Sequence, residues 1–151
     1  NETNSTAENM ETTAKPVITV KTVINAPVEK VWACWTEPSH ITTWCQASDD
    51  WHAPRAENDL QKGGKFSTTM AARDGSVSFD FNGVYTHVEQ YKVIEYILGD
   101  ERKVTIHFSG NEKETEVVES FEAEGIHPLE MQQAGWQSIL NNFKKYTEAN
   151  G

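Results

Sequence analysis

Hydrophobic residues change their spacing several times along the chain, and each change marks a different element. The stretch VITVKTVI, residues 17–24, is apolar and β-branched, which is typical of a strand. Pro27 suits the start of a helix, and an apolar face with the spacing i, i+3, i+4, i+7 follows: Val28, Val31, Trp32 and Trp35. Pro38 begins a second short helix that ends near Trp44. The pattern predicts a strand followed directly by two short helices.

From Trp51 onward, apolar and polar residues alternate, as in strands that bury one face. Turn signals separate these runs at RDG (73–75), GDER (99–102) and SGNEKE (109–114). Successive strands that are joined by short turns form an antiparallel meander. We therefore predict about six strands after the two short helices.

The C-terminal segment returns to the helical period. Pro128 begins a long helix, and one face of it carries Leu129, Gln132, Trp136, Ile139, Leu140, Phe143 and Tyr146. The predicted order is a strand, two short helices, about six strands and one long helix. This order indicates an α+β fold.

Two adjacent glycines in KGGK, residues 62–65, raise the question of a phosphate-binding loop. Such a loop needs GxxxxGK[ST] or GxGxxG between a strand and a helix. Here the glycines lie between two strand-like runs, residues 51–61 and 66–70. Because glycine reaches positive φ without steric cost, we predict that Gly63 and Gly64 form a turn and that at least one has positive φ.

The formal net charge of −10 disfavours two classes of partner. The phosphates of nucleic acid would be repelled, and so would an anionic lipid surface. No stretch approaches the ~18 consecutive apolar residues that span a bilayer, and no charged segment followed by an apolar one resembles a signal peptide. We expect no nucleic-acid binding, no membrane insertion and a cytoplasmic location.

Cysteine and histidine spacing gives no metal or cofactor motif. Cys34 and Cys45 match neither CxxC nor a zinc site, so we expect reduced thiols in a reducing compartment. No two of the five histidines are spaced i, i+4, and we expect no metal and no cofactor. Residues 1–15 are polar and lack periodicity, which predicts a disordered tail before one domain, residues 16–151.

Four stretches of the chain stand out together: INAPVEKVWACWTEPSHITTWC (24–45), NDLQKGGKF (58–66), FNGVY (81–85) and GWQSILNNFKKY (135–146). In combination they resemble the START-like (SRPBCC) superfamily, and within it the family named after the activator of the heat-shock-protein-90 ATPase. The likeness extends over residues 17 to about 147. It implies a helix-grip fold, in which a curved antiparallel sheet of about six to seven strands wraps around the long C-terminal helix and encloses an apolar cavity.

Large side chains on the inward faces are the candidates for lining such a cavity. Sites for small molecules are concave and mostly apolar, with a few convergent polar groups, and Gln132 is the polar group on the helix face. Trp44 and Trp51 lie where the short helices meet the sheet. The predicted ligand-binding set is Trp44, Trp51, Phe66, Met70, Phe79, Phe81, Tyr85, Gln132, Trp136, Ile139, Leu140 and Phe143. The alternative is that these residues only pack a closed core.

Glu119 is the candidate catalytic residue. It shares the parity of Val117 and Phe121, which predicts an inward carboxyl whose pKa is raised by burial. Asp80 and His107 have the opposite parity from their apolar neighbours, and we expect both to face solvent.

Three functions stay open at this point. The first is binding of a small apolar ligand, lipid-like or aromatic, in the cavity without a cofactor. The second, implied by the family name, is a protein-binding co-chaperone domain whose partner is a chaperone or another protein. The third is an enzyme of the polyketide-cyclase kind known in the superfamily. A cavity volume separates the first function from the second, and an inward, partnered Glu119 favours the third.

Overall fold

The computed structural model describes residues 16–45 and 49–149. The predicted tail, residues 1–15, lies outside the described residues, and its disorder stays a prediction. The elements in chain order are β1 (Val17–Ile24), α2 (Val28–Thr36), α3 (Pro38–Trp44), β2 (Trp51–Asn58), β3 (Lys65–Ala72), β4 (Ser78–Glu89), β5 (Val93–Leu98), β6 (Lys103–Gly110), β7 (Thr115–Glu122) and α4 (Leu129–Ala149). The predicted order of elements is confirmed.

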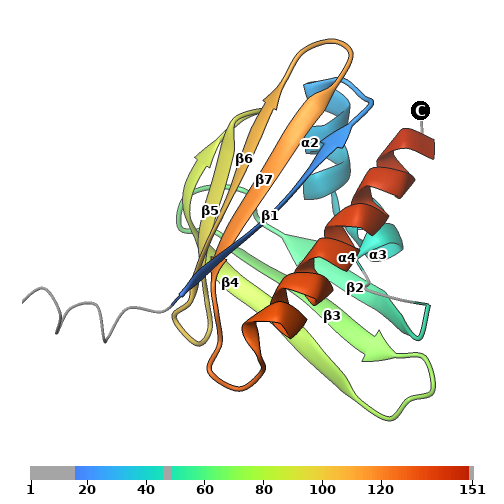
Figure 1. Cartoon of the computed structure of the whole chain (residues 1–151), viewed down its shortest axis with the longest axis vertical. Helices are drawn as coiled ribbons and strands as arrows, with labels where there is room; N and C mark the ends of the chain where they lie inside the picture. Colours follow the sequence, from blue (N-terminus) through green and yellow to red (C-terminus); the bar gives the residue numbers. More distant parts are fainter. Residues whose placement is uncertain (1–15, 46–48, 150–151) are drawn as a thin grey trace, which may run out of the picture.

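Seven strands form one antiparallel sheet in the order β1-β7-β6-β5-β4-β3-β2. Consecutive strands from β2 to β7 are neighbours and form a meander, whereas β1 pairs with β7 at the far edge. The sheet curls, and the long helix α4 lies across its concave face, with α2 and α3 near the C-terminal end of α4 (Figure 1). The predicted α+β helix-grip fold is confirmed.

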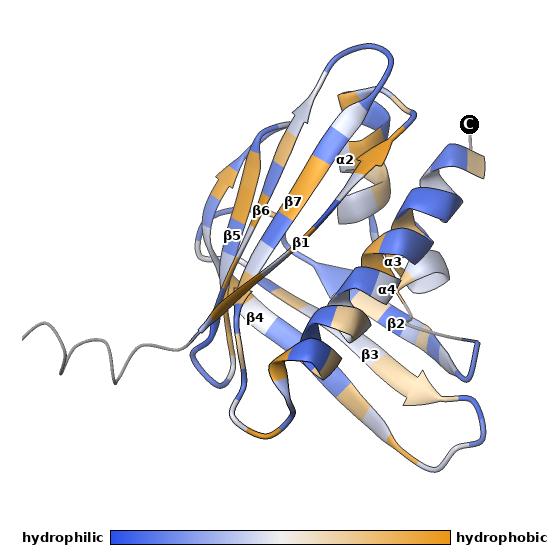
Figure 2. Cartoon of the chain, in the orientation of Figure 1, coloured by the Kyte–Doolittle hydropathy of each residue, from blue (hydrophilic) through white to orange (hydrophobic). Residues whose placement is uncertain are grey.

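Alternation along the strands decides which side chains face α4. In β7 the buried residues are Thr115, Val117, Glu119 and Phe121, each separated from the next by a more exposed residue. Figure 2 shows hydrophilic and hydrophobic bands alternating along the strands of this half of the sheet. Asp80 and His107 are exposed, as predicted from their parity. Burial of one face stabilises the sheet because that face leaves water as α4 packs on it.

The two glycines after β2 form a turn, as predicted. Gly63 has φ +85°, a conformation that residues with a Cβ rarely adopt. A Cβ on Gly64 would lie 2.1 Å from the Asp59 carbonyl oxygen, so only glycine fits there. The turn joins β2 to β3 rather than a strand to a helix. This placement removes the argument for a phosphate loop.

A third glycine, Gly83 in β4, lets an aromatic ring lie against the sheet. A Cβ at this position would come within 2.6 Å of the Ile97 carbonyl oxygen and 2.9 Å of Phe66 Cε1. The register of β4 against β5 then shifts between Tyr85 and His87. A bulge of this kind bends the strand. The bend and the missing side chain place the Phe66 ring on the concave face.

The C-terminal half of α4 closes one end of the interior. Phe143 lies against two tryptophan rings, with centroid distances of 4.9 Å to Trp35 of α2 and 4.8 Å to Trp44 of α3. Trp44 also donates a hydrogen bond from Nε1 to the Cys34 carbonyl oxygen (2.8 Å). Leu140 is likewise buried. The two short helices therefore fill this end of the sheet–helix interface with aromatic side chains.

Side chains of α4 also cover the edge strand β1. Gln137 donates from Nε2 to the Lys21 carbonyl oxygen (3.2 Å), and Lys144 donates from Nζ to the Val23 carbonyl oxygen (2.6 Å). These contacts occupy backbone acceptors that an edge strand would otherwise leave open. They hold one side of α4 along β1, so the opposite side of the helix faces the interior.

Candidate functional site

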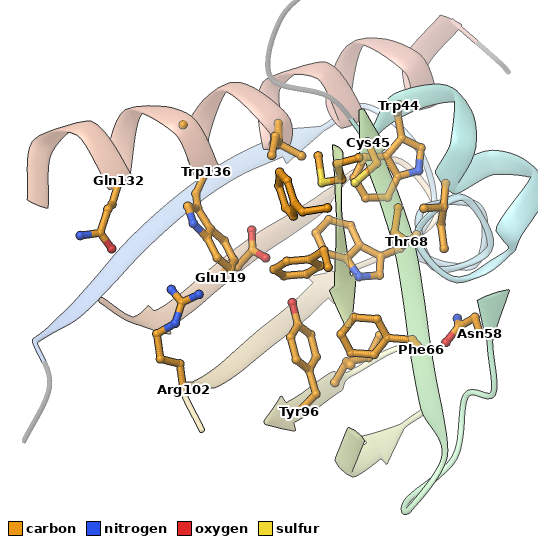
Figure 3. Close-up of a pocket in the computed structure, with 18 of the residues that line it drawn as sticks. Trp44, Cys45, Asn58, Phe66, Thr68, Tyr96, Arg102, Glu119, Gln132 and Trp136 are labelled. Carbon is orange, nitrogen blue, oxygen red and sulfur yellow. The ribbon is translucent and has the colours of Figure 1, made fainter. Parts of the chain in front are cut away.

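A cavity of about 460 Å³ lies between the N-terminal half of α4 and the concave face of the sheet. This volume falls within the range of ~300–1,000 Å³ that is typical of sites for small molecules. The helix contributes Gln132, Gly135, Trp136 and Ile139, while β3, β4, β5 and β7 contribute the opposite wall. Figure 3 shows these side chains converging on the space below α4.

Aromatic rings in mutual contact make up most of the wall. Phe66 lies 4.6 Å from Tyr96 and 5.9 Å from Phe81, measured between ring centroids. Trp136 stacks on Phe121 of β7 at 3.8 Å with an interplanar angle of 10°, and meets Phe81 edge-on at 5.9 Å. Such pairs hold ring orientations beyond what area burial alone specifies. The wall is therefore preformed around the open space.

Nine of the twelve predicted ligand-binding residues line the cavity: Trp44, Phe66, Met70, Phe79, Phe81, Tyr85, Gln132, Trp136 and Ile139. Phe79 lies at the mouth, where its side chain is 48% exposed. Met131, on the first turn of α4, is another exposed apolar residue of the lining. The mouth therefore opens between the start of α4 and the beginning of β4.

The structure places the other three predicted residues outside the lining. Leu140 and Phe143 are buried in the closed end, because α2 and α3 pack directly against them. Trp51 begins the edge strand β2 and packs edge-on against Phe79, with ring centroids 5.9 Å apart. It supports a residue of the mouth and does not itself border the space.

Gln132 is the predicted polar group of the helix face, but its amide is already engaged. Its Oε1 accepts a hydrogen bond from the backbone N–H of Glu124 (2.9 Å). Its Nε2 donates to the carbonyl oxygens of Glu124 (3.2 Å) and His127 (2.7 Å). Both amide hydrogens are thereby used. Gln132 therefore fixes the loop between β7 and α4, and its membership of the ligand-binding set stays a prediction.

Glu119 faces the cavity, as its parity predicted, and its side chain is only 6% exposed. No described residue donates a hydrogen bond to its carboxyl or forms an ion pair with it. Burial disfavours the charged form and raises the pKa of Glu119 to about 8. At neutral pH the group is therefore mainly a neutral acid, with an O–H that is free to donate.

Other polar groups of the lining went unnoticed in the sequence. The Tyr96 hydroxyl points toward the region of Glu119 (Figure 3), and burial raises the pKa of Tyr96 well above its ordinary value. Burial also raises the pKa of the Cys45 thiol to about 12, so it stays protonated. Arg102 lines the cavity while its Nε donates to Asp100 (2.7 Å). The parity of Tyr96 with Ile94 was the signal that could have identified it.

Comparison with known proteins places the chain in a family. A model of the family described as "Activator of Hsp90 ATPase homolog 1-like protein" matches residues 25–148. The chain belongs to this family. A search of curated proteins gives no match. The resemblance carried by the four sequence stretches is thus confirmed, and the family's helix-grip fold agrees with the sheet and α4 described above.

Solved structures of this family's fold are close to the chain over most of its length. The AHSA1-like protein from Aeromonas hydrophila is 43% identical, with a TM-score of 0.84, and 90% of this chain and 94% of that one are covered. Chr148 from Cytophaga hutchinsonii is 57% identical, with a TM-score of 0.76 and coverage of 88% and 92%. Protein NE0264 from Nitrosomonas europaea, at 19% identity and a TM-score of 0.76, shares the fold alone.

Two further features of this family member bear on its chemistry. The described part of the chain contains no cluster of three or more histidine, cysteine, aspartate or glutamate side chains that could hold a metal ion. Among the described helices, none is both long and apolar enough to cross a membrane.

Proposed function

We propose that this protein binds a small apolar ligand, lipid-like or aromatic, in the cavity between the sheet and α4. The observation that carries the proposal is the 460 Å³ space lined by Phe66, Phe81, Tyr96 and Trp136. A closed core would fill such a space with side chains, because protein interiors are packed as densely as organic crystals. The volume that remains matches a ligand of drug-like size.

Burial of ligand carbon supplies the affinity in this proposal. A ligand that removes ~300 Å² of apolar surface from water gains roughly 7 kcal/mol before the cost of association. Since 7 kcal/mol corresponds to a dissociation constant of ~10 μM before the association cost is subtracted, we expect dissociation constants between about ten micromolar and millimolar. The ring contacts around Trp136 lower the cost of association, because the wall does not have to reorganise when the ligand enters.

An enzyme of the polyketide-cyclase kind receives less support. Glu119 points inward, but among the described residues it has no hydrogen-bond partner that would set up acid–base transfer. Tyr85, the tyrosine of the predicted ligand-binding set, donates its hydroxyl hydrogen to Asn58 Oδ1. The cavity thus holds a buried acid without an activated nucleophile or a paired base.

A co-chaperone role is the second candidate, because the family model carries the name of an ATPase activator. It also has one structural feature in its favour. Ile126, Leu129 and Met131, at the start of α4, are large apolar residues exposed to solvent. A protein partner that covered them would gain apolar burial. Met131 also lines the cavity, so binding experiments must distinguish the two roles.

Titration with the uncharged fluorophore N-phenyl-1-naphthylamine tests the proposal. We expect its emission to rise and saturate on binding, and an excess of a long-chain alcohol or a flavonoid-like aromatic to displace it. Gly135→Leu, which fills the cavity, should abolish the signal, and Ala134→Leu on the exposed neighbouring position is the matched control. An identical signal from both variants would place the fluorophore on the surface and contradict the proposal.

Native mass spectrometry of the protein purified from its own host gives an independent answer. A co-purified small molecule that dissociates on collisional activation would support the proposal and reveal the ligand class. Recovery of the protein in stoichiometric complex with a chaperone, with no small molecule bound, would favour the co-chaperone role instead.

A further inference from the structure

We propose that the cavity selects uncharged ligands that carry a hydrogen-bond acceptor, such as a ketone, ester or alcohol oxygen, and that the Glu119 carboxyl donates the bond that orients them. This inference rests on the proposed function and specifies its ligand class. It concerns one polar atom of the ligand, set within an otherwise apolar framework. Three features of Glu119 support this role: its position, its lack of partners among the described residues and the charges around it.

The surroundings of Glu119 in the sheet direct its carboxyl toward the cavity. Glu119 lies near the middle of β7, between Val117 and Phe121, and its strand neighbours in the sheet are Val20 and Ile106. All four of these neighbours are buried and apolar. Because these neighbours offer no polar partner, the carboxyl can meet one only in the cavity that it lines (Figure 3). A ligand in the cavity would lie directly against it.

The Glu119 carboxyl has no hydrogen-bond partner among the described residues. Buried polar groups in native proteins are almost always hydrogen-bonded, because a buried group without a partner costs ~1–3 kcal/mol. No hydrogen bond joins the Glu119 side chain to any residue that the structure describes, although the side chain is 6% exposed. A ligand oxygen would satisfy the group. The Glu119 carboxyl borders the cavity, so a ligand oxygen can accept its hydrogen bond without displacing a hydrogen bond to any described residue.

The surrounding charges decide which form of the acid faces the ligand. Arg102 is the one basic side chain among the described lining residues that is always charged, and its guanidinium is held by Asp100. The other ionisable groups facing the space include Cys45 and Tyr96, both kept neutral by burial. At the rim, His127 hydrogen bonds hold the pKa of Glu124 below its usual range. No described cation is placed to stabilise an ionised Glu119.

The remaining ionisable groups of the lining lie apart from Glu119 on other elements. Glu57 of β2 is exposed, and burial raises the pKa of Tyr85 of β4. The helix α4 contributes only uncharged side chains to the lining. A ligand anion would meet Glu57 and Glu124 among the described lining residues, and the one permanently charged base there, Arg102, already pairs with Asp100 through Nε. This arrangement disfavours a ligand carboxylate, which would lose its hydration for a counter-charge that it has to share with Asp100.

A second donor lies close to the first. The Tyr96 hydroxyl is directed from β5 toward the same region (Figure 3), and no described residue accepts its hydrogen bond. A carbonyl oxygen has two lone pairs, so it can accept from Glu119 and Tyr96 together. A site that is built to hydrogen-bond a ligand rejects the analogue that lacks the matching atom, because its own polar groups are then left unpaired.

Three ligands with the same aromatic framework test the inference by isothermal titration calorimetry: 2-acetylnaphthalene, 2-naphthoate and 2-ethylnaphthalene. The first has a neutral acceptor, the second a charge and the third neither. At pH 6.5 we expect the ketone to bind about five- to tenfold more tightly than the other two, the value of one net hydrogen bond. Equal affinities of the ketone and the hydrocarbon would overturn the inference.

Variants of Glu119 identify the donor. Glu119→Gln keeps a donor and should retain ketone affinity within about threefold, whereas Glu119→Leu should lose about tenfold for the ketone and nothing for 2-ethylnaphthalene. In the wild type, ketone affinity should fall as the pH rises through about 8, where the carboxyl ionises, and Glu119→Gln should show no such fall. Should Glu119→Leu not fold, the Gln variant and the pH profile still decide.

The outcomes separate the two proposals. Failure of all three naphthalenes to bind the wild type would overturn the proposed function and this inference with it. Binding of all three with equal affinity, abolished by Gly135→Leu, would support the cavity as a ligand site and overturn only the role of Glu119. A ketone preference that persists unchanged at pH 9.5 would also contradict Glu119 as the donor.

Discussion

The two halves of α4 carry the same kind of inward face but have different surroundings. In the C-terminal half, Leu140 and Phe143 are in full contact with the core, and Phe143 is 0% exposed. In the N-terminal half, Trp136 and Ile139 are only partly buried and border a 460 Å³ space. Both pairs follow the helical period, so periodicity alone does not distinguish them.

What lies opposite each half makes the difference. The C-terminal half faces Trp35 and Trp44, which α2 and α3 insert between helix and sheet. Among the described elements no helix covers the N-terminal half, which faces the strongly curved strands β3 to β5 and the bulge in β4. Gly135 adds to the open space, because a Cβ there would meet nothing within 4 Å.

Truncation of one aromatic residue in each half should give the largest contrast. Phe143→Ala should lower the free energy of unfolding by about 3–5 kcal/mol, because the ring leaves a cavity in a packed region. Trp136→Ala should cost about half of that, since one side of the Trp136 ring already faces open space. Urea denaturation of the two variants measures both costs. Equal losses would mean that both halves are equally packed.

Glu119→Gln should sharpen the contrast through the pH dependence of stability. The folded-state pKa of Glu119 lies near 8, above its ordinary value of 4.5. The native state therefore holds a proton that the unfolded chain releases, so stability falls as the pH rises from about 4.5 to about 8 and the loss is constant above that range.

Because each pKa unit is worth ~1.4 kcal/mol, the Gln variant should be about 3 kcal/mol more stable than the wild type at pH 7 and nearly equal to it at pH 4. Urea unfolding at pH 4, 7 and 9 measures this difference. Glu116→Gln, on an exposed position of the same strand, is the matched control. A Glu119→Gln variant without any gain at pH 7 would show that the carboxyl is ionised or solvated.

The smallest expected effect is at Gly135. Gly135→Ala should stabilise the protein by about 1 kcal/mol, because alanine favours the helix and the added methyl meets no neighbour. Its affinity for N-phenyl-1-naphthylamine should change less than that of Gly135→Leu. Thermal unfolding and the fluorescence titration give the two values. A destabilised Gly135→Ala would indicate that the space beside α4 is already filled.

Alternation and helical period predicted the order of elements and several orientations, whereas the placement of α4 inside the curved sheet came from the family resemblance. The periods gave the meander and the inward Glu119, because side-chain parity on a strand follows directly from the sequence. They did not reveal that the Gln132 amide already bonds the chain, since its partners are backbone groups of Glu124 and His127. They also could not separate Leu140 from Ile139, because packing across the interior depends on distant elements.

Chemical-shift mapping tests the central claim most directly. Assigned ¹H–¹⁵N spectra of the wild type, recorded while 2-acetylnaphthalene is added, report on both halves of α4 at once. We predict shifts for Trp136, Tyr96 and Glu119, and for the Trp136 indole N–H, with the amides of Leu140 and Phe143 essentially unchanged. Shifts confined to the exposed residues at the start of α4, or no shifts at any concentration, would contradict a ligand site in the cavity.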